Sequence, residues 1–126
     1  MTFRIRRIFY LFSIVALASA CSLPAHAWWG SKKRAQEKAG AALFYSKGCS
    51  HCHGADLQGK KNVPSIANIR KDKSWTPERI TGQILHGGKK MPPFADSLTD
   101  QDISDLVAFL RARHRPAPPA TASAAE

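Results

Sequence analysis

The sequence contains no run of residues that alternates polar and apolar side chains over the length of a β-strand, and it contains no internal repeat. A half-buried strand needs that period of two, whereas an amphipathic helix needs a period near 3.6. The missing alternation argues against the βαβ scaffold on which Cys-x-x-Cys thiol oxidoreductases are built. We therefore expect an all-α fold.

Sulfur-containing residues are scarce. The chain has three cysteines and, apart from the initiator, one methionine, Met91. Cys49 and Cys52 fall in the segment CSHCH at residues 49–53, beside His51 and His53. A structural zinc site needs four ligands, usually from two closely spaced pairs. No second Cys or His pair exists elsewhere in the chain, so zinc is disfavoured.

The N-terminal 27 residues have the features of a secretory signal peptide. Three arginines at positions 4, 6 and 7 precede an uncharged run from Ile8 to Ala20, and Ala25 and Ala27 form an A-x-A cleavage signal. We expect cleavage after Ala27 and export to the periplasm, an oxidising compartment where free thiols do not persist. Membrane contact would require a retained leader, giving an anchored protein facing the periplasm, or a lipidated Cys21.

Composition divides the exported chain into three parts. Residues 28–34 form a short leader, residues 35–115 the folded domain, and residues 116–126 a Pro/Ala-rich tail that lacks large apolar side chains and is expected to be disordered. A domain this small has a marginal core, which a buried cofactor would stabilise. The formal charge of +10 falls to +7 after cleavage, with 16 Lys+Arg against 9 Asp+Glu. No nucleic-acid recognition motif accompanies this charge, so a nucleic-acid partner is not expected.

Three helices can be located by their end signals. The first covers residues 34–47 and ends at Gly48. The second has Thr76 as N-cap, Pro77 as its first residue and Gly87 as its stop.

The third helix has the clearest apolar periodicity. It follows Thr99 as N-cap and places apolar residues at positions 103, 106, 107 and 110. We expect it to end before Pro116, with the basic residues at 111, 113, 114 and 115 complementing the negative end of the helix dipole.

The CSHCH segment matches the Cys-x-x-Cys-His pattern of c-type haem attachment. Two intervening residues place both sulfurs along one edge of the porphyrin, and the adjacent histidine is then delivered to the iron. We therefore expect Cys49 and Cys52 to carry one covalent haem c through thioether bonds and His53 to be the axial imidazole ligand. His51 is interpreted as an exposed spacer.

Met91 is the candidate for the other axial position. Glycines and lysines precede it and Pro92 and Pro93 follow it, so it has no helical face on which to pack as an ordinary core methionine. The two prolines stiffen the chain beside the sulfur; His86 is the less suitable alternative. An iron with both axial positions filled has no vacancy for substrate, which favours one-electron transfer over catalysis. Methionine ligation also raises the reduction potential.

With these residues in place, residues 40–113 resemble a class I cytochrome c of the small bacterial mono-haem type. The resemblance is carried by the haem segment AGAALFYSKGCSHCHG, by VPSI at residues 63–66, and by GGKKMPPFADSLTDQDISDLVAFL. It implies three main helices wrapped around one covalent haem. In this family the first and last helices cross at a small residue and two aromatics, here Gly40, Phe44 and Phe109.

The resemblance also implies roles for individual residues near the cofactor. The carbonyl of Pro64 would accept the His53 Nδ1 proton, Ile66 would line the haem, and Trp75 would either reach a haem propionate or pack as an ordinary aromatic residue.

The sequence thus favours an exported electron carrier rather than an enzyme, working in a respiratory chain between a respiratory or dehydrogenase donor and a terminal oxidase or reductase. The alternative is a dedicated cytochrome subunit of a membrane-associated or periplasmic oxidoreductase. Redox partners with an acidic docking patch are expected if the loop lysines and Arg70 surround the haem edge. Solubility alone would explain these charges equally well. The loop residues concerned are Lys60, Lys61, Arg70, Lys71, Lys73, Lys89 and Lys90.

Overall fold

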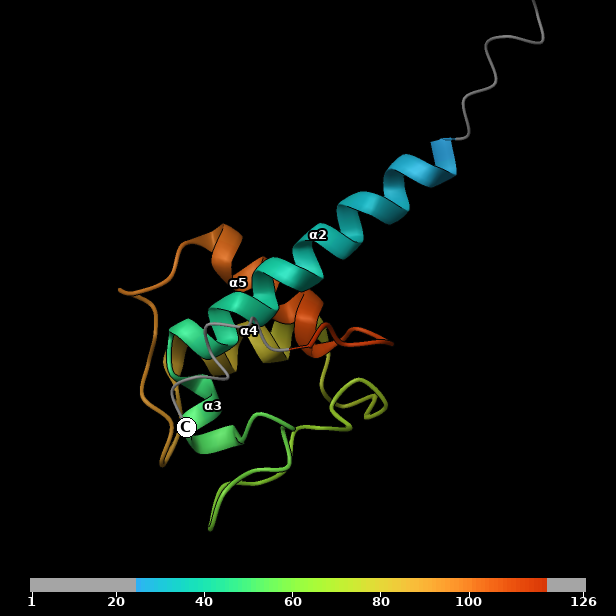
Figure 1. Cartoon of the computed structure of the whole chain (residues 1–126). Helices are drawn as coiled ribbons and strands as arrows, with labels where there is room; N and C mark the ends of the chain where they lie inside the picture. Colours follow the sequence, from blue (N-terminus) through green and yellow to red (C-terminus); the bar gives the residue numbers. More distant parts are fainter. Residues whose placement is uncertain (1–24, 118–126) are drawn as a thin grey trace, which may run out of the picture. The chain divides into compact units, whose positions relative to one another are not determined.

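A computed structural model describes residues 25–117 of the chain. These residues form the helices α2 (Ala25–Ser46), α3 (Cys49–His53), α4 (Pro77–His86) and α5 (Asp100–Leu110), joined by loops at residues 54–76 and 87–99 (Figure 1). No strand occurs within residues 25–117, as the all-α prediction requires. The chain divides into two compact units, residues 1–30 and 31–126. The core and every residue discussed below as part of the site belong to the second unit.

The first helix is longer than predicted. α2 begins at Ala25 rather than at Arg34, because residues 25–33 contain no proline and include alanines, the residue type with the highest helix propensity. Its C-terminal end agrees with the prediction, since the backbone N–H of Gly48 donates to the carbonyl of Tyr45. The predicted signal peptide and lipidation site at Cys21 lie almost wholly outside the described residues, as does most of the predicted tail.

α2 crosses α5 in close contact at Gly40. A methyl group built on Gly40 would lie 2.8 Å from the Cβ of Phe109 and would overlap the backbone carbonyl of Asp105. Four residues further along α2, the ring of Phe44 lies 5.4 Å from that of Phe109, with the two planes inclined at 50°. Phe44 and Phe109 are 2% and 1% exposed, so the predicted helix crossing is confirmed and forms the centre of the core.

α4 and α5 begin at the predicted caps. The Thr76 hydroxyl accepts from the Arg79 N–H, and Pro77 follows as the first helical residue. Thr99 forms a reciprocal capping box with Asp102, in which each side chain bonds to the other residue's backbone N–H. Ile80 and Ile84 of α4 are buried in the same cluster as the apolar face of α5.

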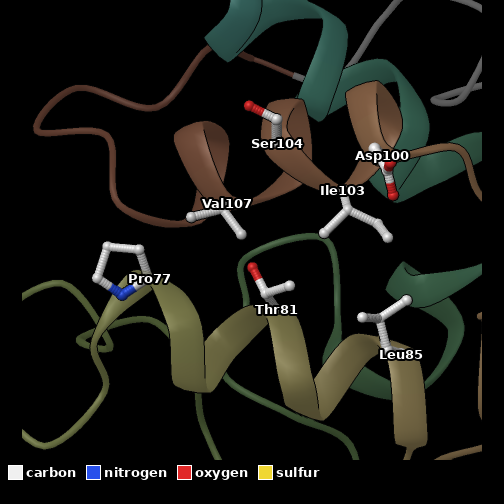
Figure 2. Close-up of a pocket in the computed structure, with 7 residues that line it drawn as sticks. All are labelled: Pro77, Thr81, Leu85, Asp100, Ile103, Ser104 and Val107. Carbon is white, nitrogen blue, oxygen red and sulfur yellow. The ribbon is translucent and has the colours of Figure 1, made fainter.

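A shallow groove separates the outer faces of α4 and α5. Figure 2 shows Thr81 and Leu85 of α4 facing Ile103 and Val107 of α5 across it. Its other lining residues are Pro77, Asp100 and Ser104. None of the four residues predicted to bind the cofactor lines this groove.

The last helix is shorter than predicted, because α5 ends at Leu110 rather than just before Pro116. The chain instead turns at Arg111, where the Ala112 N–H donates to the Phe109 carbonyl. This turn buries Ala112 and brings the Arg111 guanidinium to the Trp75 carbonyl at 2.6 Å. Arg115 still serves the helix end as predicted, because its Nη2 donates to the Leu110 carbonyl at 3.0 Å.

Candidate functional site

The CSHCH segment forms a helix of its own, α3, which the sequence analysis did not predict. Cys49 and Cys52 are three residues apart, and residues at that spacing lie on the same side of a helix. Neither is part of a disulfide; Cys49 is half-buried against the core and Cys52 is exposed. Burial raises the pKa of the Cys49 thiol, and the neighbouring charge of Cys52 adds to this effect against an opposing backbone hydrogen bond.

His53 lies at the C-terminal end of α3, half-buried beside the core. The centre of its ring is 6.5 Å from that of Phe44. Burial lowers the pKa of His53, which favours the neutral imidazole, the form that binds a metal ion. His51, in contrast, is exposed, as expected for a spacer.

The Nδ1 atom of His53 is buried and meets no hydrogen-bond partner among the described residues. The carbonyl of Pro64 therefore does not play the role that the family resemblance implied. Pro64 is exposed, and the chain beside it is engaged elsewhere, since the Ile66 N–H donates to the Leu57 carbonyl at 2.9 Å. An orphaned imidazole nitrogen in a buried setting is costly unless something pairs with it.

The loop after α3 holds the end of the helix in place. The Gly59 N–H donates to the His53 carbonyl at 2.8 Å, and the Lys60 N–H to the Cys52 carbonyl at 3.0 Å. The Tyr45 hydroxyl, on α2, donates to the Ala55 carbonyl at 3.0 Å. These bonds satisfy carbonyls at the C-terminus of α3 and fix its position against α2.

Met91 lies in the loop between α4 and α5, half-buried against the hydrophobic core. Its carbonyl accepts from the Gly88 N–H at 2.8 Å. Three residues later, the Phe94 N–H donates to the Ile84 carbonyl at 3.1 Å, which ties the loop back to α4. The core cluster links the predicted ligands: Cys49 and Met91 both pack against it, and its member Phe44 lies beside His53.

The other residues considered as an iron ligand or as haem contacts are His86, Ile66 and Trp75. His86, the less suitable alternative to Met91 in the sequence, is exposed at the end of α4. Ile66 and Trp75 are half-buried against the core, and the Arg79 guanidinium lies 4.4 Å above the Trp75 ring. Within residues 25–117, no three His, Cys, Asp or Glu side chains gather into a group that could hold a metal ion, so the described side chains assemble no zinc-type ligand set.

Two residues that support the site, Tyr45 and Gln83, were not predicted from the sequence. Tyr45 ties α2 to the loop after His53, and Gln83 donates from its side-chain amide to the Gly87 carbonyl at 2.6 Å. The signal for Gln83 was present, because a polar amide one turn before a helix-terminating glycine can reach the last free carbonyls. Tyr45 gives no such local signal, since its partner lies in a separate element.

Comparison with known proteins places this site in a family. Residues 35–110 match the family model described as cytochrome C oxidase, cbb3-type, subunit III. Cytochrome c6 of Nostoc sp. (strain PCC 7120 / SAG 25.82 / UTEX 2576) is 28% identical over 102 residues, covering 79% of this chain and 89% of the relative. No solved structure matches.

Two further relatives are larger proteins. The cbb3-type cytochrome c oxidase subunit FixP of Sinorhizobium medicae (strain WSM419) is 30% identical over 86 residues, covering 57% of this chain but 28% of FixP. The menaquinol:cytochrome c reductase cytochrome c subunit of Bacillus subtilis (strain 168) is 31% identical over 71 residues, covering 56% of this chain and 26% of the relative. The likeness is therefore to one portion of each.

The match to the family model covers more than half of the chain and includes all of α3, α4 and α5. Membership brings a covalently bound haem c, and it makes the protein an electron carrier rather than an enzyme. Its homologues function with redox partners such as oxidases or reductases. The chain belongs to the family of cbb3-type cytochrome c oxidase subunit III domains and is a small class I mono-haem cytochrome c.

Proposed function

We propose that this cytochrome binds haem c through Cys49 and Cys52, with His53 and Met91 as axial ligands. The observation that carries the assignment is the arrangement of α3, where two cysteines share one side of a short helix and are followed directly by a half-buried imidazole whose pKa is lowered by burial. The buried Nδ1 of His53 also supports a bound group at this place, because an orphaned polar atom in a buried setting is costly unless something pairs with it.

Each residue has a separate task in this proposal. The sulfurs of Cys49 and Cys52 would anchor the cofactor covalently, and the hydrogen bonds to the Cys52 and His53 carbonyls hold the backbone from which the His53 ring extends. Met91 supplies a soft, neutral sulfur from a loop whose backbone is tied to α4. Reversible one-electron oxidation and reduction is the chemistry that bound haem supplies.

We further propose that the protein is exported and carries electrons in the periplasm between a respiratory or dehydrogenase donor and a terminal oxidase or reductase. The likeness to cytochrome c6 over most of both chains supports a free carrier. Within residues 25–117 no helix has the length and apolar character needed to cross a membrane.

The loops carry an exposed set of positive charges that supports docking to acidic partners. Lys60, Lys61, Lys71, Lys73, Lys89 and Lys90 are all exposed in the loops that flank α3 and Met91. Opposite charges on two redox partners steer their encounter and raise the association rate. We therefore propose an acidic docking patch on the partner.

A second candidate function is that of a dedicated subunit in an oxidoreductase complex. It is favoured by the likeness to portions of FixP and of the Bacillus reductase subunit. Size-exclusion chromatography of native extract separates the two functions. A free carrier elutes alone at about its own mass, whereas a subunit co-elutes with a larger complex.

The test of the proposed ligands is the visible spectrum of the exported protein in both oxidation states. Sharp α and β bands in the reduced form that survive acid-acetone extraction show covalent haem, and Cys49→Ala together with Cys52→Ala should abolish that retention. The oxidised form should show the weak far-red band of a sulfur–iron bond. A Met91→Ala variant that keeps this band would overturn the assignment of Met91.

A further inference from the structure

The loop that carries Met91 is attached to α4 at three points, and one of them depends on a side chain. Two attachments are made by backbone atoms: the Gly87 N–H donates to the Gln83 carbonyl at 2.9 Å, and the Phe94 N–H donates to the Ile84 carbonyl at 3.1 Å. The third is the 2.6 Å bond from the Gln83 side-chain amide to the Gly87 carbonyl. Only this last attachment can be removed by changing a side chain.

Gln83 binds the first residue of the loop, Gly87, through two hydrogen bonds. It receives the Gly87 N–H on its own carbonyl and donates its side-chain amide to the Gly87 carbonyl, so one residue engages both polar groups of Gly87. The same amide nitrogen fills the space beside Gly88, where an added Cβ would lie 2.8 Å from it. The Gln83 side chain therefore fixes the positions of two consecutive loop residues.

The backbone of Gly87 lies close to the residues at and after Met91, and only a glycine leaves room for them. It adopts a φ of 67° and a methyl group built on it would lie 2.7 Å from the Pro92 carbonyl carbon and 2.8 Å from the Pro93 nitrogen. The loop thus folds back on its own entry, and the Gly88 N–H reaches the Met91 carbonyl at 2.8 Å. Because the Gly88 N–H binds the Met91 carbonyl, contacts that hold Gly87 and Gly88 in place also hold the backbone of Met91 in place.

From these contacts we infer that Gln83 is a positioning residue for Met91, because its side chain holds the loop in the form that presents the methionine sulfur. The inference rests on the proposed ligation by Met91. A loop without this bond opens more often, and each opening frees the axial position for a competing ligand. Gln83 touches neither the iron nor the cofactor in this role.

The experiment is a titration of the oxidised holoprotein with imidazole, a small ligand that can bind only where the methionine has left. Loss of the far-red band reports the displacement. Gln83→Leu keeps the size of the side chain and removes the donor, and Gln83→Glu keeps its shape but presents an acceptor to the Gly87 carbonyl. Both should bind imidazole more tightly, by about 2- to 12-fold for a typical net hydrogen bond.

Gln101→Leu is the matched control. Gln101 also makes one side-chain amide bond, 2.8 Å to Asp105 Oδ1, but it lies on α5 rather than in the loop. It should leave imidazole affinity within about twofold of the wild type, well below the effect of a lost hydrogen bond in the loop. Denaturant unfolding of all variants measures their global stability. A general loss of stability would raise imidazole affinity in any destabilised variant, whichever glutamine was changed, whereas a local effect on Met91 would raise it only in the Gln83 variants.

Each outcome bears on a different claim. A wild-type protein without the far-red band refutes ligation by Met91, and with it the role of Gln83. A wild-type protein with the band, combined with unchanged imidazole affinity in both Gln83 variants, refutes the positioning role alone. An equal gain in affinity in Gln101→Leu also refutes that role.

Discussion

At the scale of single residues, Gly40 sets how closely α2 and α5 can approach. Its missing side chain leaves room for the Asp105 backbone and the Phe109 Cβ. We predict that Gly40→Ala destabilises the holoprotein by about 1–3 kcal/mol, the typical cost of inserting a methyl group into a filled core. Denaturant unfolding followed by far-ultraviolet circular dichroism measures this.

Gly82 provides the control for that substitution. It lies in the interior of α4, and a Cβ built on it would meet nothing within 4 Å. Gly82→Ala should stabilise the protein by roughly 0.5–1 kcal/mol, because alanine loses less backbone entropy in a helix. If both glycine variants change stability in the same direction, close packing at Gly40 is not the cause.

At the scale of the helix, α5 depends on its first turn. The Thr99 hydroxyl accepts from the Asp102 N–H at 3.2 Å, and the Asp102 carboxylate accepts from the Thr99 N–H at 2.9 Å. We predict that Thr99→Ala costs about 0.5–2 kcal/mol of stability, as for other N-cap threonines. Denaturant midpoints compared with the wild type test this.

The capping box also makes the stability of α5 depend on pH. The backbone N–H of Thr99, together with its hydroxyl, holds the pKa of Asp102 below its usual value. A carboxyl group whose pKa is lowered by folding stabilises the protein above its unfolded pKa, and the contribution is lost as the pH falls through the folded pKa. Asp102→Asn should therefore be less stable than the wild type at neutral pH, and the difference should shrink in acid. A difference between the two proteins that stays the same from neutral to acid pH would contradict this prediction.

The ends of the helices show which parts of the fold can be predicted from local sequence. Thr76 and Thr99 were identified as caps because their bonds run to residues three positions away. The end of α5 could not be predicted in this way. The turn at Arg111 is stabilised by burial of Ala112 and by a bond to the Trp75 carbonyl, 36 positions away in the chain.

The same distinction applies to the site. Cys49, Cys52 and His53 fall within five residues, so their closeness in space follows from the sequence, although the helix that they form was not predicted. The partner expected for His53 Nδ1 was wrong, because Pro64 belongs to a separate loop whose course is set by contacts such as Ile66 with Leu57. Contacts between loops depend on the whole fold and leave no local pattern.

At the scale of the whole molecule, the positive charge should govern how fast the protein exchanges electrons with charged reagents. The formal charge is +10 for the full chain, and the loop lysines are exposed. Oxidation of the reduced protein by anionic ferricyanide should slow as salt concentration rises, because screening weakens the attraction. Oxidation by a cationic cobalt complex should accelerate under the same conditions. Stopped-flow absorbance measures both rates, and equal salt dependence would refute electrostatic steering.

The small core predicts that the fold depends on its cofactor. Among the described residues, the buried hydrophobic side chains lie within positions 41–112, and the buried Nδ1 of His53 has no hydrogen-bond partner there. We predict that the Cys49→Ser, Cys52→Ser double variant, which cannot bind haem covalently, shows lower helicity and a broad, weakly cooperative unfolding transition. Circular dichroism and thermal melting test this. A sharp transition at the holoprotein midpoint would contradict it.

The unequal exposure of the two cysteines has a consequence for the order in which the protein binds haem and folds. Cys52 is accessible in the finished fold, whereas Cys49 packs against the core. If both become bonded to haem as proposed, the half-covered sulfur of Cys49 is easier to reach before the core packs against it. We therefore expect the yield of mature cytochrome to fall in a variant whose helices close faster, because less of the chain would then capture the cofactor at Cys49.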